Sequence, residues 1–303
     1  MVDFKNRHVQ GVLLAILGAM MFSSKAILVK LSYQYNVDKV SLLFMRMGFA
    51  LPIYVVIAFY QFKKERSRTV SSKEWLTLIF VGIIGYYLAS FLDFWGLQFI
   101  GAGMERLILF LYPTMTVILS ALILKKTITK IQVVAIVIAY IGIAVAFWEQ
   151  LFVGHSKEFW FGVILVFCSA LTYSFYLIGS DKIIPKLGVL KFTSYCMIIS
   201  CLVVIGHYNL TSETKILDLP WQAHLLGFSV SIFNTVIPSF IISAAIFRIG
   251  SAKTSILSSV GPVSVLVTAA IFLGEEITGY KIAGTLIVIA GVLLISTSKK
   301  QVR

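Results

Sequence analysis

The chain has 303 residues, of which 59% are hydrophobic and 13% charged, with a formal net charge of +13. Soluble globular domains hold roughly 45–50% apolar and about 25% charged residues, so the composition excludes an ordinary soluble domain and favours the bilayer. The basic residues lie in short loops between long apolar runs, and for that reason no nucleic-acid partner is expected.

Ten apolar runs are long enough to cross a bilayer as helices, which takes about 20 residues each. The runs are continuous rather than alternating, which favours helices over barrel strands. The predicted spans are residues 11–31, 40–60, 75–99, 106–124, 131–148, 160–179, 192–208, 224–247, 255–273 and 281–297. The first run resembles a signal peptide, but it lacks a convincing cleavage site and is interpreted as a retained helix.

The loops differ in charge according to the side of the membrane on which they fall. With the N-terminus inside, 18 of the 26 Lys and Arg residues lie in inner loops and 6 in outer loops. Cytoplasmic loops of membrane proteins carry this excess. Both termini are therefore expected in the cytoplasm, which agrees with an even number of spans.

The sequence repeats itself once. Five residues of the first half recur 149 positions later: Ser90, Gly101, Pro113, Thr129 and Gly142 match Ser239, Gly250, Pro262, Thr278 and Gly291. We therefore divide the chain into a first repeat, residues 1–150, and a second, residues 151–303, each with five spans. Because five is odd, the second repeat is expected to insert upside down relative to the first.

Three motifs carry a family resemblance. A proline lies inside the fourth and ninth spans, in LYPTMTVILSALIL (111–124) and VGPVSVLVTAAIFLGEEIT (260–278), and the glycine-dotted run AGTLIVIAGVLL (283–294) follows. With these motifs the chain resembles the EamA family of the drug/metabolite transporter superfamily over nearly its whole length. The resemblance implies a ten-helix carrier whose first, third, fourth, sixth, eighth and ninth helices line the cavity. One departure is that the first half has KKTIT (125–129) where the second has GEEIT (274–278).

Charged side chains inside the apolar runs are the strongest site candidates, because a charge within the bilayer is costly and so marks function by default. Lys25, Arg46 and Asp93 lie within spans, and Glu105 and Arg106 begin the fourth span. All five are expected in the outer half of the first repeat, and the second repeat has no comparable cluster. We predict that Lys25 or Arg46 pairs with Asp93 or Glu105, to bind a charged or zwitterionic solute or to close an outer gate. The alternative is an ion-pair network that only fixes helix packing.

Aromatic and amide side chains supply further candidates for substrate binding or gating. These are Tyr87, Trp95, Tyr173, Tyr176 and Asn234. An aromatic stripe is more often packing or an interfacial belt than a binding wall, so a structural role is the alternative here.

Prolines within spans are candidate hinges. Pro238 cannot donate a hydrogen bond to the carbonyl of Asn234, and the freed polar group can line a cavity. Pro113 and Pro262 are expected to act similarly in the fourth and ninth spans.

These features predict an all-α integral membrane protein of ten transmembrane helices, built as two inverted repeats. The expected function is secondary transport of a small solute (an amino acid, a related metabolite or a drug) across the plasma membrane, the bacterial inner membrane, by alternating access. The expected partners are that solute and membrane lipid. A coupling proton or sodium ion and a homodimer are left open.

The sequence lacks the motifs that are typical of other functions. No Walker phosphate loop, HExxH or GxSxG occurs, the three cysteines form no CxxC, and the histidines lack metal-ligand spacing. We therefore expect neither an enzyme nor a cofactor or metal site. An intramembrane enzyme and a non-transporting scaffold or receptor are the alternatives.

Overall fold

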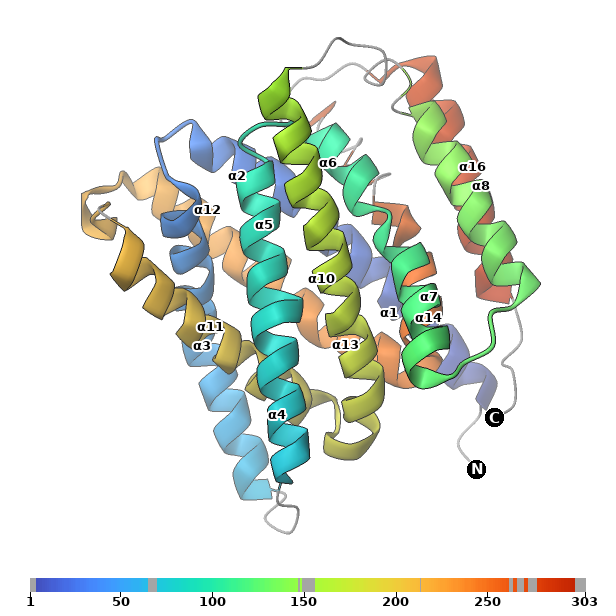
Figure 1. Cartoon of the computed structure of the whole chain (residues 1–303), viewed down its shortest axis with the longest axis horizontal. Helices are drawn as coiled ribbons and strands as arrows, with labels where there is room; N and C mark the ends of the chain where they lie inside the picture. The colour runs from blue at the N-terminus through green and yellow to red at the C-terminus, as the bar shows by residue number, and fades with distance from the viewer. Residues whose placement is uncertain are drawn as a thin grey trace.

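The computed structural model describes residues 4–64, 70–146, 148, 156–212, 214–261, 264–265, 270–271 and 277–297. Within these residues the secondary structure is entirely helical (Figure 1). Seven helical runs are long and apolar enough to cross a membrane: Arg7–Tyr33, Lys39–Lys63, Ser72–Gly96, Met104–Leu124, Lys157–Leu187, Val189–Thr211 and Trp221–Ile249. Two shorter apolar helices are Lys130–Ala146 and Gly279–Leu294.

These runs correspond to nine of the ten predicted spans. The ninth predicted span, residues 255–273, is described only in part, by α14 (Ser251–Leu257), η4 (Ser258–Val260) and a few residues beyond. The count of ten crossings, the inverted orientation of the repeats and the cytoplasmic termini stay predictions.

Most runs are built from more than one helical element. The first four runs contain α1 (Phe4–Ser23), α2 (Lys25–Tyr33), α3 (Lys39–Lys64), α4 (Ser72–Phe80), η1 (Val81–Leu88), α5 (Ala89–Gly96), α6 (Ala102–Leu109) and α7 (Tyr112–Leu124). The later elements are α8 (Lys130–Ala146), α10 (Lys157–Leu187), α11 (Val189–Thr211), η2 (Ile216–Asp218), α12 (Trp221–Ser231), η3 (Ile232–Val236), α13 (Ile237–Ile249) and α16 (Gly279–Thr297).

Two spans contain a π-helical segment, which the sequence did not predict. Val81–Leu88 and Ile232–Val236 are both π-helical. The repeat offset of 149 places the first of them on residues 230–237, which include the second. A π-helix widens the turn and is often found at functional sites. The two segments therefore mark equivalent places in the two halves of the chain.

Two other spans are interrupted. α1 ends at Ser23 and α2 begins at Lys25, so the first span breaks at Ser24. α6 ends at Leu109 and α7 begins at Tyr112, one residue before Pro113. Pro113 therefore lies at the break of its helix, in the first turn of the following one, where its missing N–H costs nothing.

In Figure 1, α1 begins at the lower right, and α3 ends and α4 begins at the bottom. α8 and α16 pack side by side along their lengths at the right of the view, and α14 contacts both of them (Figure 1).

Glycines allow the close approach of α8 and α16. A Cβ atom added at Gly142 would lie 2.7 Å from the backbone nitrogen of Val288 and 2.8 Å from the carbonyl oxygen of Gly284. Both atoms belong to backbone, so neither can move aside without a shift of the helix. Small residues commonly provide such contacts between membrane helices, where close packing drives association.

We expect Gly142→Ala to destabilise the protein by about 1–3 kcal/mol, because the methyl group overpacks this interface. The control is Gly206→Ala in α11, where an added Cβ meets nothing within 4 Å. That change is expected to be neutral or stabilising, since alanine favours a helix over glycine. Thermal unfolding of the two purified variants in detergent checks the opposite signs. Equal unfolding temperatures would contradict the tight α8–α16 contact.

Candidate functional site

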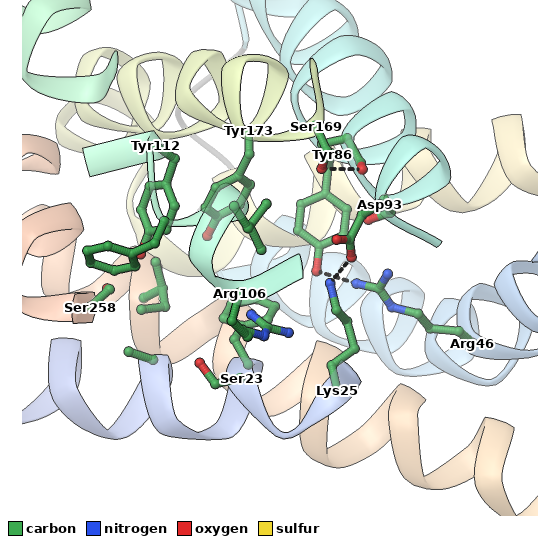
Figure 2. Close-up of a pocket in the computed structure, with 17 residues that line it drawn as sticks. Ser23, Lys25, Arg46, Tyr86, Asp93, Arg106, Tyr112, Ser169, Tyr173 and Ser258 are labelled. Carbon is green, nitrogen blue, oxygen red and sulfur yellow. Dashed lines mark hydrogen bonds and ion pairs between the residues drawn. The ribbon is translucent and has the colours of Figure 1, made fainter. Parts of the chain in front are cut away.

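A cavity of about 90 Å³ lies between the two halves of the chain. We call it the central cavity. Its walls come from α1, α2, α3, η1, α5, α6 and α7 of the first half and from α10, α13 and η4 of the second. Four charged side chains line it: Lys25, Arg46, Asp93 and Arg106 (Figure 2). Tyrosine and serine side chains supply most of the remaining polar lining.

Two ion pairs are present in the predicted charge cluster. Lys25 pairs with Asp93, and their side chains are 10% and 2% exposed. Arg106 Nε lies 2.9 Å from Glu105 Oε2, although the two groups are not aligned for a hydrogen bond. Of the pairings that the sequence left open, the structure therefore contains Lys25 with Asp93, while Glu105 lies beside its neighbour Arg106.

Arg46 differs from the other charged residues because it has no acidic partner among the described residues. It is 1% exposed. Its Nε donates to Thr235 Oγ1 at 2.6 Å and its Nη2 to the Tyr86 hydroxyl at 3.2 Å, while Nη1 has no hydrogen-bond partner. The guanidinium also lies over the rings of Tyr86 and Phe94, at 5.6 and 5.4 Å from their centroids. Neutral groups thus hold a buried positive charge without neutralising it.

The neighbours of Arg46 come from both halves. Tyr86 belongs to the π-helical segment of the third span and Thr235 to that of the eighth. These two positions are 149 residues apart, the offset of the internal repeat. Arg46 therefore bridges equivalent positions of the two halves.

The Asn234 side chain donates hydrogen bonds at the break in the first span. Its Nδ2 donates to the carbonyl of Met21 and, at 2.7 Å, to Ser24 Oγ, while its Oδ1 has no partner. Lys25 is the first residue after this break and reaches Asp93 from there. Broken helices with free polar groups commonly form the binding sites of transporters. Asn234, predicted as a site residue, thus shapes the site without lining the cavity.

The wall opposite the charges is aromatic. Tyr112 and Tyr173 line the cavity and their rings meet edge to face at 5.4 Å. Tyr173 stacks on Tyr176 at 5.7 Å, and Tyr176 meets Tyr86 at 5.3 Å. A row of four tyrosines therefore runs from the cavity wall to Arg46. Figure 2 shows Tyr86 beside Lys25 and Arg46, with Tyr112 at the far side.

Some of the predicted residues lie away from the cavity lining. Tyr87 bonds to His207 Nδ1 at 2.9 Å, and Trp95 meets Phe161 edge to face. Glu105 and Tyr176 are fully buried just behind the lining. Pro238 lies in the first turn of α13, two residues after the end of the π-helical segment. Pro262 lies outside the described residues.

Sequence reasoning missed two lining tyrosines and a second polar cluster. Tyr86 and Tyr112 gave only weak signals, an aromatic run and a position before Pro113. The second cluster joins the ends of three helices: Asp181 Oδ2 accepts from Lys126 Nζ at 2.5 Å and from the Ser251 N–H and hydroxyl at 2.9 and 2.6 Å. We call it the Asp181 tie. It borders a second cavity of about 1210 Å³, lined by basic residues such as Arg7, Lys125 and Arg248.

The comparisons with known proteins identify the family. The model of the EamA-like transporter family matches residues 9–148 and 160–297. The chain belongs to this family. It is a multi-pass membrane transporter, and its family and apolar helices fit the bacterial inner membrane.

Individual relatives agree. The uncharacterized transporter YcbK of Bacillus subtilis is 24% identical over 281 residues, covering 90% of this chain and 88% of that protein. A probable amino-acid metabolite efflux pump of Salmonella typhimurium is 25% identical over 203 residues, covering 64% of this chain and 67% of that protein. A solved crystal structure shares the fold with a TM-score of 0.73 at 15% identity, covering 94% of this chain and 95% of that one.

The Lys25–Asp93 pair is expected to stabilise the solute-free protein. Removing one partner of a buried ion pair leaves an uncompensated charge, so Lys25→Met and Asp93→Asn should each cost about 3–5 kcal/mol. The double variant should lose much less than the sum, because no charge is then left alone. Thermal unfolding of the purified variants measures this, with the exposed Lys157→Met as control. Additive losses would show that the two side chains act separately.

Proposed function

We propose that the chain is a secondary transporter that carries a small solute across the plasma membrane by alternating access, with the central cavity as its solute site. The observation that carries the proposal is a buried, charged cavity whose walls come from both halves of the chain. A cavity between two similar bundles can open to one side or the other as the bundles exchange conformations. Ten spans in two inverted repeats, with both termini in the cytoplasm, are part of the proposal.

The irregular helices support movement around the cavity. The breaks at Ser24 and before Pro113, and the two π-helical segments, all lie at its level along the spans. Helices bend at such places with little loss of hydrogen bonding, because their backbone groups already have other partners. Asn234 is one such partner, because it bonds to the break in the first span. We propose Pro113, Pro238 and Pro262 as parts of these hinges.

The Asp181 tie supports a gate at the end of the bundle where Arg7, Lys126 and Arg248 gather, the proposed cytoplasmic end. It joins α10, the end of α7 and the start of α14 through one carboxylate. A single side chain that holds three helix ends can keep one entrance closed while the other is open. Its loss would free all three ends together.

The proposed substrate is an amino acid, a related metabolite or a drug. The relative named as a probable amino-acid metabolite efflux pump favours the first two. Coupling to a proton or to a sodium ion is left open. A transport rate that changes with the gradient of one of these ions would identify it as the coupling ion.

Counterflow tests the proposed function. Purified protein is screened by thermal unfolding against pools of metabolites, and each stabilising solute is then loaded into proteoliposomes. We expect external labelled solute to accumulate transiently and with saturation, and Lys25→Ala and Asp93→Ala to reduce the rate at least about tenfold, the effect of a lost charged contact. Linear, unsaturable flux would favour a channel, and stabilisation without any flux would favour a receptor or scaffold.

The gate is tested by accessibility. Ser120 lies behind the Asp181 tie and is 2% exposed. In a chain whose three native cysteines are replaced by alanine, we expect Asp181→Asn to speed maleimide labelling of Ser120→Cys severalfold, because the three helix ends separate. Lys182→Gln, the adjacent exposed position, is the control. Equal labelling rates in both variants would argue against a gate at this end.

A further inference from the structure

We infer that the solute of the central cavity is a small organic monoanion, a monocarboxylate or a compound of equivalent charge, whose negative group binds Arg46. The inference rests on the proposed carrier function, because it names the class of solute that the same cavity takes. It is based on the net charge of the groups at the cavity and on the hydrogen-bond partners of the Arg46 side chain.

The charge of the cluster is the first step. Lys25 lies within electrostatic range of Asp93, Arg106, Glu105 and Arg46. Three of these five groups are cationic and two are anionic, so the formal sum is +1. Lys25 with Asp93 and Arg106 with Glu105 form the two ion pairs. Arg46 is therefore the group left over, and one negative charge neutralises the cluster.

The second step is that Arg46 cannot lose its charge or escape to water. A guanidinium stays protonated in proteins, whereas a buried lysine can become neutral. Arg46 lies seven residues after Lys39, the first residue of α3, and it is 1% exposed, so its side chain does not extend to the membrane surface. A lone cation in this environment is costly unless a counter-ion is supplied. The described residues around it supply only hydroxyls and aromatic rings.

The third step is that donors are available for the missing anion. Among the described residues, Arg46 Nη1 has no hydrogen-bond partner, and neither has Nη2 of Arg106, which lines the same cavity. In Figure 2 the Arg46 and Arg106 guanidinium groups lie on either side of the Lys25 ammonium group. Guanidinium N–H groups bind carboxylates with strong, charge-assisted hydrogen bonds. A carboxylate placed here also satisfies buried donors that otherwise have none.

The remaining lining indicates what the rest of the solute is like. Tyr112 and Tyr173 line the side away from Arg46 in Figure 2, and Phe110, Leu109 and Ile242 also line the cavity. An apolar or aromatic body therefore fits behind the negative group. A zwitterion would present its ammonium group to Asp93 Oδ1, which has no hydrogen-bond partner among the described residues, but it leaves the formal +1 of the cluster uncorrected.

The test is thermal unfolding of the purified full chain at fixed ionic strength with four phenyl compounds: phenylacetate, phenylalanine, phenethylamine and phenethyl alcohol. Matched aliphatic monocarboxylates, amino acids, amines and alcohols complete the panel. We expect monocarboxylates to raise the unfolding temperature most. The inference is overturned if amines, alcohols or zwitterions stabilise as well or better, or if no carboxylate stabilises at all.

Variants of Arg46 test whether the carboxylate binds at this residue. Arg46→Gln should weaken binding of the best carboxylate by at least about tenfold, and Arg46→Lys, which keeps the charge but not the fork of donors, should fall between. Lys157→Gln, exposed and distant from the cavity, should bind as wild type. The solute-free Arg46→Gln protein should unfold at or above the wild-type temperature, because it no longer buries an unpaired charge. Unchanged carboxylate affinity in Arg46→Gln would make Arg46 a packing residue only.

Proteoliposomes separate this inference from the carrier function. If a carboxylate binds in a manner that needs Arg46 but gives no counterflow, the anion site is supported and the proposed carrier function is contradicted. If an amine or a neutral solute shows saturable counterflow that is equal in wild type and Arg46→Gln, the proposed carrier function is supported and the anion site is overturned.

Discussion

One buried guanidinium constrains the centre of this protein. Arg46 lies between the π-helical segments of the third and eighth spans and donates to one hydroxyl on each. Both segments present those hydroxyls to the same point, so this side chain links the two halves of the chain at the cavity. Because these contacts are neutral, they hold the arginine in place and leave its charge to act on whatever enters the cavity.

The two halves contribute different chemistry around this point. All five charged groups of the cluster belong to the first half, on α2, α3, α5 and α6. The second half contributes hydroxyl and amide groups such as Thr235, Asn234 and Tyr173. At the repeat equivalents of Lys25 and Asp93, at an offset of 151 in the first span and 149 in the third, it has Tyr176 and Ile242. The two halves thus share a π-helical segment at equivalent positions, while all five charged groups of the cluster lie in the first half.

The sequence predicted the helices well because hydrophobic length is a strong signal in a bilayer. For the same reason it singled out Lys25 and Asp93, charges inside apolar runs that pair and line the cavity in the structure. It could not decide which charges pair, because pairing depends on helix rotation, which depends on packing between spans. Lys25 with Asp93 and Arg106 beside Glu105 were two of several arrangements that fit the spacing.

Backbone irregularities were harder to predict than charges. Neither π-helical segment has a proline within it, and Val81–Leu88 has an ordinary apolar composition. The first of them packs closely against the sixth span: a Cβ added at Gly85 would lie 2.7 Å from the backbone nitrogen of Tyr176. Tyr87 and Trp95 were chosen from spacing on a regular helix, and a π-helical turn rotates the residues after it relative to those before it. The Tyr86 hydroxyl accepts a hydrogen bond from Arg46 and Tyr87 contacts His207, so the two neighbouring tyrosines lie on different faces of the third span. Which of them reaches the cavity depends on how the third span packs against the sixth, and the spacing of aromatic residues alone does not give that packing.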